Sequence, residues 1–314
     1  MRILKLVKQK NATVKQSYRQ DTVQSYLMLA PMLIGFALFT IYPMVWLIRW
    51  SWFNYDGISP PSFVGIDNYV RAFTRDSLYW DSLVNTFIIV AAKFVLEIPL
   101  ALFLAVVLNS GKKINSLFRT LFFSPTIVST AIVGIVFFLM FEPFLGSVNQ
   151  LLKASHIIET NINWFGNKWL ADSVIVIASV WKGFGMNMIF FIMGLQNINQ
   201  EIYECADIDG VSKWTRFTKI TLPLLAPTGK VIMMLFIVNS IKMSDLVLVL
   251  TNGQPGGSTE VVMSYTFKYF FSYGAADAIS QYGYSSALAV ITAIILTIVV
   301  SLYMRLTRNV GAYY

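Results

Sequence analysis

The chain has 314 residues, of which 56% are hydrophobic, 15% aromatic and only 13% charged. A soluble domain carries about 25% charged residues, so this composition excludes an ordinary soluble globular protein and indicates a chain that lies in lipid. The net charge of +8 does not indicate nucleic-acid binding, because the lysines and arginines fall in short segments between long apolar runs. These basic residues are therefore interpreted as topology signals.

Six apolar runs are each long enough to cross about 30 Å of hydrocarbon as a helix. In chain order they cover residues 26–48, 84–108, 117–140, 173–195, 224–250 and 285–304. They are too long and too uniformly apolar to be the alternating strands of a barrel. Prolines occur inside or at the ends of four runs, where neighbouring helices can satisfy the freed backbone groups: Pro31, Pro99, Pro125 and Pro227. The sequence thus predicts an all-α polytopic membrane protein with six transmembrane helices.

The distribution of basic residues predicts the orientation. The two termini and the second and fourth connections together carry 14 lysines and arginines, and the other three connections carry 6. The richer side is normally cytoplasmic, so both termini are predicted to lie in the cytoplasm. The first run lacks a small-residue cleavage site and is predicted to be a retained span. The predicted organisation is a basic tail over 1–25, one transmembrane domain over 26–305 and a second tail over 306–314.

The fourth connection, residues 199–223, is longer and more organised than a membrane turn requires. Asn199 can cap a short helix, and Glu201 and Glu204 suit the positive N-terminal end of that helix. Gly210 can adopt the left-handed conformation that ends a helix and reverses the chain. The segment is therefore predicted to be a helix, a turn and the start of the next span. The alternative interpretation is a basic, solvated loop anchored by a few apolar residues.

This connection resembles the EAA signature of inner-membrane permeases of binding-protein-dependent ABC importers. The signature residues are Glu204-Cys-Ala206, Gly210, Ile220 and Leu222-Pro223. The chain is most similar to the carbohydrate branch, the maltose-type permeases, through Tyr203, Asp209, Trp214, Phe217 and Pro227, and through the motifs Ile41-Tyr-Pro43, Gly65-Ile-Asp-Asn-Tyr69 and Thr251-Asn-Gly-Gln-Pro-Gly-Gly257. The resemblance covers about 26–305. Cys205 replaces the second alanine of the signature, a small-for-small change that is expected to leave docking intact.

The resemblance implies a MetI-like, type I importer permease in the bacterial cytoplasmic membrane, forming an alternating-access path for a sugar or oligosaccharide. The implied partners are a second, related permease in an expected heterodimer, two cytoplasmic ABC ATPase subunits and an extracytoplasmic solute-binding protein. In this family the fourth connection forms a coupling helix that sits in a groove of the ATPase. The implied coupling residues are Glu204, Cys205, Ala206, Asp209, Gly210, Phe217, Ile220, Leu222 and Pro223.

No chemistry of its own is expected from this chain. Gly111-Lys-Lys and Gly229-Lys-Val lack the spacing and hydroxyl of a phosphate-binding loop, so ATP and Mg are expected on the partner ATPase. His156 and Cys205 are the only residues of their types, which gives no metal site, no cofactor and no nucleophilic constellation. The remaining alternative is a secondary transporter or channel driven by an ion gradient, which explains the spans but not the fourth connection.

Polar side chains within the spans indicate a substrate path. A charged side chain at the bilayer centre costs about 2.5 to 3.5 kcal/mol, so it normally faces the bundle interior or a wet cavity. The candidates are Lys93 and Glu97 on the second span, Trp181, Lys182 and Asn187 on the fourth, and Asn239, Ser240, Lys242 and Asp245 on the fifth. The spacings of Lys93 with Glu97 and of Lys242 with Asp245 also fit internal ion pairs.

The charges of these candidates leave the cargo open. Three mid-span lysines face two mid-span carboxylates, so one positive charge has no evident partner on this chain. An anionic sugar is one explanation. The alternatives are that Lys182 extends its stem to water, or that the sister permease supplies a carboxylate.

Overall fold

The computed structural model describes residues 24–110, 113–272 and 280–308. Five of the described helices are long and apolar enough to cross a membrane: Gln24–Trp50, α4 (Ser77–Leu108), α8 (Lys168–Gln196), Lys213–Ile241 and α14 (Tyr282–Leu306). A bent pair, α5 (Lys113–Ile127) and α6 (Thr130–Met140), makes a sixth when it counts as one span. With the bent pair counted as one span, the prediction of an all-α protein with six spans is confirmed. The predicted tails over 1–25 and 306–314 lie mostly outside the described residues.

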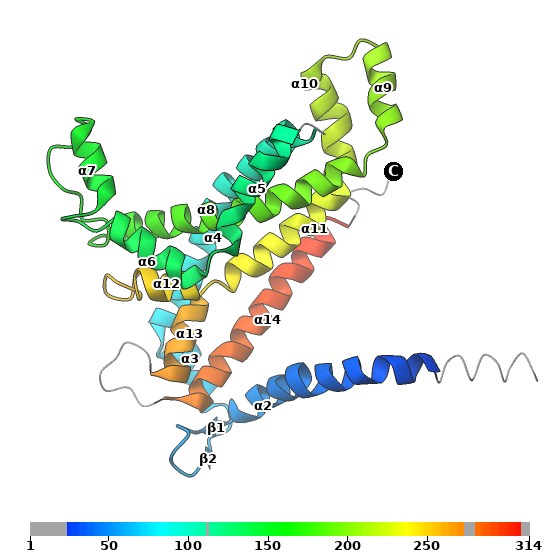
Figure 1. Cartoon of the computed structure of the whole chain (residues 1–314). Helices are drawn as coiled ribbons and strands as arrows, with labels where there is room; N and C mark the ends of the chain where they lie inside the picture. The colour runs from blue at the N-terminus through cyan, green and yellow to red at the C-terminus, as the bar shows by residue number, and fades with distance from the viewer. Residues whose placement is uncertain (1–23, 111–112, 273–279, 309–314) are drawn as a thin grey trace, which may run out of the picture.

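The longest helices contain local changes of winding, and short elements cover both ends of the bundle. Gln24–Trp50 includes the π-helical turn η1 (Ala37–Ile41) followed by α2 (Tyr42–Trp50), and Lys213–Ile241 joins α10 (Lys213–Arg216), η2 (Phe217–Thr221) and α11 (Leu222–Ile241). The short elements are β1 (Phe53–Asn54), β2 (Ser62–Phe63), α3 (Asp67–Thr74), α7 (Ser147–Ala154), α9 (Gln200–Ile208), α12 (Asp245–Leu250) and α13 (Val262–Phe271). Helices α9 and α10 lie at one end of the molecule, with the strands and α3 at the other (Figure 1).

Two predicted spans are broken, so the prediction of continuous helices over 117–140 and 224–250 is wrong. Helices α5 and α6 meet at an angle of 93°. Ser129 between them is extended, with φ −55° and ψ 137°, and Pro125 supplies no backbone N–H to the last turn of α5. The fifth span ends at Ile241, and α12 starts anew at Asp245. The polar residues around this second break interrupt the apolar run.

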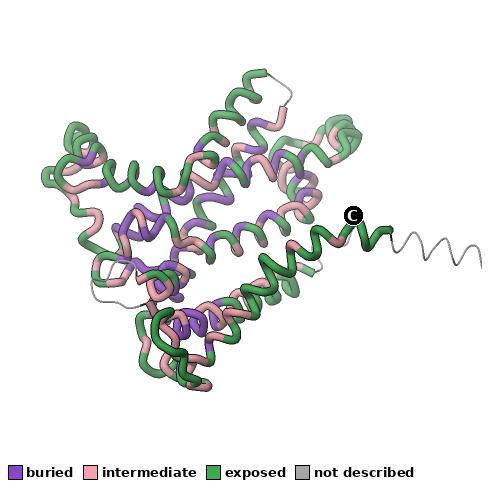
Figure 2. Tube along the Cα trace, turned by 60° about the horizontal axis from the view of Figure 1, so that its bottom comes forward, coloured by how far each residue is buried: buried purple, intermediate pink, exposed green. Residues whose placement is uncertain are grey.

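Helix α8 is the centre of the bundle. In its most apolar 18-residue stretch, 61% of the residues are buried inside the chain, whereas the corresponding value for the helix Gln24–Trp50 is 0%. Helix α5 approaches α8 so closely that a Cβ at Gly185 would lie 2.1 Å from the Phe122 carbonyl oxygen. Figure 2 shows purple, buried residues along the central helices, whereas the helix Gln24–Trp50, which leads into the grey trace, is mostly green. This first helix therefore presents its apolar surface to lipid or to another chain.

The end that carries the strands is closed by buried polar contacts. Asn68 is 8% exposed and donates to the main-chain oxygens of Ser51 and Phe53, both at 3.0 Å. The Asp76 carboxylate caps α4 and accepts a hydrogen bond from the Tyr265 hydroxyl at 2.6 Å. Burial, followed by this carboxylate, raises the pKa of Tyr265. Asn68 of the Gly65–Tyr69 motif therefore ties the strand β1 to α3.

Candidate functional site

The fourth connection folds into a helical hairpin with well-defined ends. The Asn199 side chain accepts a hydrogen bond from the Glu201 N–H at 3.1 Å and caps α9, as predicted. Gly210 has φ +68°, and the next N–H, from Val211, donates to the Ala206 oxygen at 3.0 Å. This bond and the one from the Gly210 N–H form the left-handed termination that glycine favours, so the predicted helix end is present.

Side-chain contacts fix α9 to the base of the fifth span. Arg216 pairs with Asp207 at 2.5 Å, and its guanidinium lies 5.8 Å from the centre of the Tyr203 ring. The Tyr203 hydroxyl donates to Thr221 Oγ1 at 3.2 Å. Because α10, η2 and α11 form one helix, these contacts join α9 to a membrane span. Sequence reasoning did not find these pairs, since their partners lie on different helices on either side of a turn.

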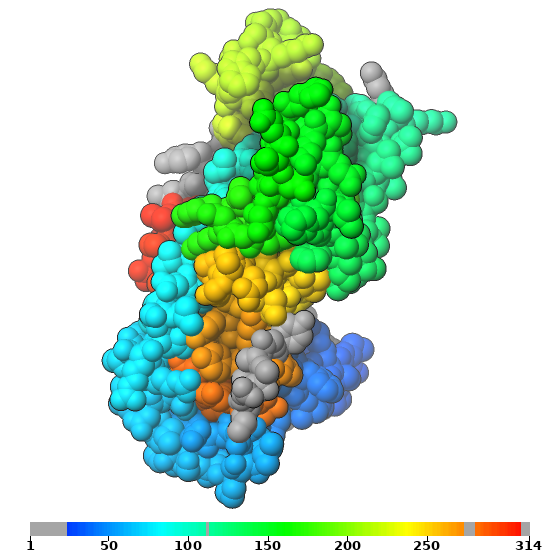
Figure 3. Space-filling view, turned by 90° about the vertical axis from the view of Figure 1, so that its left-hand side faces the viewer, coloured from blue at the N-terminus to red at the C-terminus, as the bar shows by residue number. Residues whose placement is uncertain are grey.

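The predicted coupling residues are divided between the surface and the interior of the hairpin. Glu204, Cys205, Asp209, Gly210 and Leu222 are exposed, Ala206 is buried, and Phe217, Ile220 and Pro223 are half-buried. Two large apolar side chains that are not among the predicted coupling residues are also strongly exposed, Ile208 at 86% and Trp214 at 73%. In Figure 3 the yellow-green hairpin forms one extremity of the molecule. The hairpin thus presents apolar and acidic groups at an end remote from the strands.

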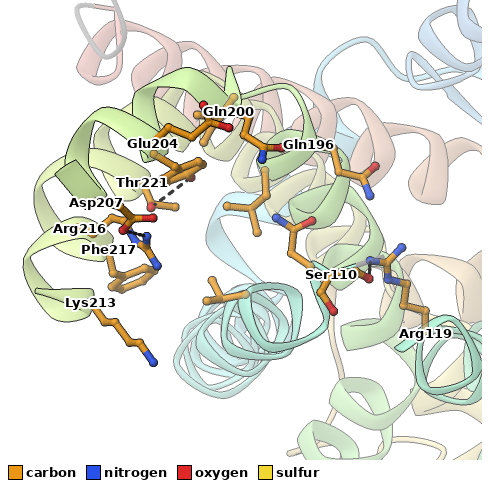
Figure 4. A pocket seen from close by; sticks show the side chains of 15 residues that line it. Ser110, Arg119, Gln196, Gln200, Glu204, Asp207, Lys213, Arg216, Phe217 and Thr221 are labelled. Carbon is orange, nitrogen blue, oxygen red and sulfur yellow. Dashed lines mark hydrogen bonds and ion pairs between the residues drawn. The ribbon is translucent and has the colours of Figure 1, made fainter. Parts of the chain in front are cut away.

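A cleft of about 730 Å³ separates the hairpin from the ends of α4 and α5 (Figure 4). Its lining is about equally polar and apolar and carries both signs of charge, including Glu204, Asp207, Lys213 and Arg216. On the opposite wall Arg119 donates to the Leu108 oxygen at 2.6 Å and closes the last turn of α4.

A second cavity, of about 330 Å³, lies where the two broken spans meet α4 and α8. Five of the nine predicted path residues line it: Lys93, Lys182, Asn239, Lys242 and Asp245. The remaining four are Glu97, Asn187, Ser240 and Trp181. The first three bond to Lys93 or to one another, and Trp181 contacts Phe137 with ring centres 5.7 Å apart. The structure therefore brings residues from the second, fourth and fifth predicted spans to one place.

The buried charges behind this cavity form a connected polar cluster. Lys93 lies 3.7 Å from Glu97 and donates to Ser240 Oγ at 3.1 Å. Asn187 donates to Glu97 at 2.7 Å. The internal pair expected from the spacing of Lys93 and Glu97 is therefore confirmed. In the described part of the chain Lys242 forms no such pair with Asp245, whose carboxylate accepts a hydrogen bond from Ser244 at 3.0 Å.

Lys182 bonds to the backbone at the break between α5 and α6. Its ammonium donates to the main-chain oxygens of Val128 at 3.0 Å and Thr126 at 3.4 Å, and Thr126 Oγ1 donates back to the Lys182 oxygen at 3.1 Å. These oxygens belong to the end of α5, where helical partners are missing. Sequence reasoning missed four residues of the cavity wall: Thr126, Thr130, Ser179 and Gly183. Pro125, which precedes Thr126, was the available signal of a break in this span.

Comparison with known proteins identifies the architecture. Residues 97–311 match the family model described as "Binding-protein-dependent transport system inner membrane component". The chain is 32% identical over 286 residues to the probable ABC transporter permease protein YesP of Bacillus subtilis, covering 90% of each chain. It is also 32% identical over 303 residues to the trehalose/maltose transport system permease protein MalF of Thermococcus litoralis, covering 95% of this chain and 98% of the relative.

A solved structure shows the same fold. It is a chain from a bacterial ABC transporter involved in the import of the acidic polysaccharide alginate, with a TM-score of 0.79 and 22% identity over 95% of this chain. The family model covers the hairpin, both broken spans and the cavity wall except Lys93. Membership in this family argues against a transporter or channel driven by an ion gradient. The chain belongs to the inner-membrane permeases of binding-protein-dependent ABC transport systems and has their MetI-like, type I fold.

Proposed function

We propose that this permease forms the path for a sugar or oligosaccharide, delivered by an extracytoplasmic solute-binding protein and moved by alternating access. The similarity to a trehalose/maltose permease over nearly the whole of both chains supports a sugar as cargo. The cavity supports a path through the bundle, because it lies where spans are broken and polar groups gather.

The helical hairpin is the feature that supports a role for this chain in coupling the ATPase to the substrate path. Glu204, Cys205, Ala206, Asp209 and Gly210 belong to α9 and its turn. Phe217, Ile220, Leu222 and Pro223 belong to the helix that continues into the membrane. A partner that moves the first set moves the second through Asp207 and Arg216. Such a rigid element in contact with both partners is what coupling between distant sites requires.

The proposed complex contains a second, related permease, two ATPase subunits that hold ATP and Mg, and the binding protein, in the bacterial cytoplasmic membrane. This chain is proposed to hydrolyse nothing itself. The unburied apolar surface of Gln24–Trp50 is available to such a membrane partner as well as to lipid.

Reconstitution tests the proposal. Proteoliposomes that hold the permease pair and the ATPase are given binding protein and labelled oligosaccharide outside and ATP inside. We expect uptake that stops when ATP is replaced by a non-hydrolysable analogue and that continues when ionophores collapse all ion gradients. Uptake that follows an ion gradient without ATP would contradict the proposal.

A further inference from the structure

The cavity at the broken spans carries more positive than negative charge. Its wall includes the ammonium groups of Lys93, Lys182 and Lys242 and a single carboxylate, that of Asp245. Glu97 is not in the wall, but it pairs with Lys93 at 3.7 Å and accounts for that charge. The remaining wall therefore holds two cations and one anion.

The partners of the two remaining lysines do not neutralise them. Lys182 donates to main-chain oxygens, which are uncharged and leave its positive charge in place. Lys242 is exposed to the cavity and forms no ion pair in the described part of the chain. Asp245 lies three residues further along but is bonded to Ser244, beyond the end of α11. Within the described residues, one positive charge of the cavity wall thus lacks a counter-charge.

A helix terminus adds to this field. Helix α6 begins at Thr130, which lines the cavity, and the side chain of Ser129 makes no capping hydrogen bond. Thr130 thus brings the N-terminal end of α6, where the helix dipole is positive, to the cavity wall. Helix termini and lysines together favour an anion more strongly than either does alone.

We infer that the cargo is an acidic sugar, and that its carboxylate, or another anionic group, is received by Lys242 and Lys182 beside the first turn of α6. This inference rests on the proposed function and names the substrate class of the same path. The cavity volume of about 330 Å³ lies at the lower end of the range for ligand pockets, which suits one charged ring at a time better than a whole polymer.

Lys242 is the residue on which the test depends, because its side chain is exposed and its replacement removes no internal bond. The probes are uronic acid oligosaccharides of several linkages, each paired with its carboxyl-reduced, neutral counterpart of the same linkage and length. Uptake is measured per assembled importer in proteoliposomes with binding protein and ATP. We expect the wild type to prefer an acidic probe over its neutral counterpart by at least about tenfold, since one charge pair away from bulk water readily supplies that factor.

Lys242→Gln should lower uptake of the acidic probe at least about tenfold and leave little preference over the neutral one. Lys242→Arg keeps the charge and should retain the preference, as should Lys153→Gln on the remote helix α7. Lys182→Gln should also lower uptake of the acidic probe. Lys182→Arg keeps the positive charge, so comparison of the two variants separates the effect of the charge from the effect of the hydrogen bonds to the end of α5.

The outcomes distinguish a failure of the acidic-cargo inference from a failure of the proposed sugar importer. Equal uptake of the acidic probe by wild type and Lys242→Gln would overturn the inference. Uptake of neutral sugars alone would also overturn it, while the proposed sugar importer would stand. Absence of ATP-driven uptake for every sugar of both classes would count against the proposed function itself.

Discussion

Lys93 and Glu97 illustrate how single residues allow full charges within the bilayer. They are 8% and 2% exposed and lie one helical turn apart on α4. Each has a further neutral partner, Ser240 for the lysine and Asn187 for the carboxylate. Such a pair adds little net stability compared with apolar residues, but removal of one member leaves an uncompensated buried charge.

Lys93→Met should therefore destabilise the protein more than replacement of both charges does. We expect the single variant to lose about 3 kcal/mol or more, and Lys93→Met combined with Glu97→Met to recover much of that loss. The measurement is the thermal midpoint of the purified complex by fluorescence-detected size exclusion. Additive effects of the two single substitutions would show that the pair is not coupled.

Gly210 is the second position where one residue controls a larger element. Its φ of +68° costs an ordinary side chain about 1 to 2 kcal/mol, and a β-branched side chain suffers most. Gly210→Val should insert into the membrane but lose co-purification with the ATPase or lose substrate-stimulated hydrolysis. Gly210→Asn is the matched control, because asparagine tolerates this conformation and no neighbouring atom lies within 4 Å of its Cβ. Normal coupling in the valine variant would contradict the role of the turn.

Among the elements, the broken spans depend on close packing between α5 and α8. The backbones approach closely at Gly185, where any side chain would meet the Phe122 oxygen. Lys182, one turn earlier on α8, then bonds to the end of α5. The position of the break is thus set from α8 and not by α5 alone.

Gly185→Ala should push the two helices apart and cost about 1 to 3 kcal/mol of stability. Gly229→Ala in α11 is the matched control, since nothing lies within 4 Å of a Cβ there and alanine favours a helix. The two variants are compared by the thermal midpoint of the purified complex. A midpoint that falls equally in both would refute the special role of the α5–α8 contact.

The same elements show what the sequence could and could not predict. The number and rough positions of the spans were predictable, because roughly 20 consecutive apolar residues have few alternatives in lipid. The end of α9 was predictable from Gly210. The break after Ile127 was not, because mean hydropathy is insensitive to a bend of 93° and Pro125 is compatible with both a kinked and a straight helix. The bond between Arg216 and Asp207 depends on the turn geometry, which no local pattern encodes.

For the whole molecule, the asymmetry of basic residues makes a topological prediction. The hairpin and the end of α14 lie at the same end of the structure, opposite the strands (Figure 1). In a Cys205→Ser background, single cysteines at Ser59 or Ser155 should react with an impermeant reagent added outside intact cells, whereas those at Ser116 or Ser212 should not. All four positions are exposed on this chain, so a reaction with the outside reagent reports the side of the membrane on which a position lies. Outside labelling at Ser212 would invert the orientation.

The two breaks also affect how the molecule behaves in an energised membrane. Non-helical backbone within a membrane is tolerated where it lines a wet cavity, so we expect water to replace part of the insulating hydrocarbon at the two breaks. The sealed stretch that remains must then withstand the full membrane voltage over a shorter distance. An anion that leaves the cavity for a cytoplasm held at negative potential works against about 2.3 kcal/mol per charge for each 100 mV crossed. For the acidic cargo inferred above, the broken spans would place its charge inside this electric field, and we expect part of the work of the proposed ATP-driven cycle to be electrical.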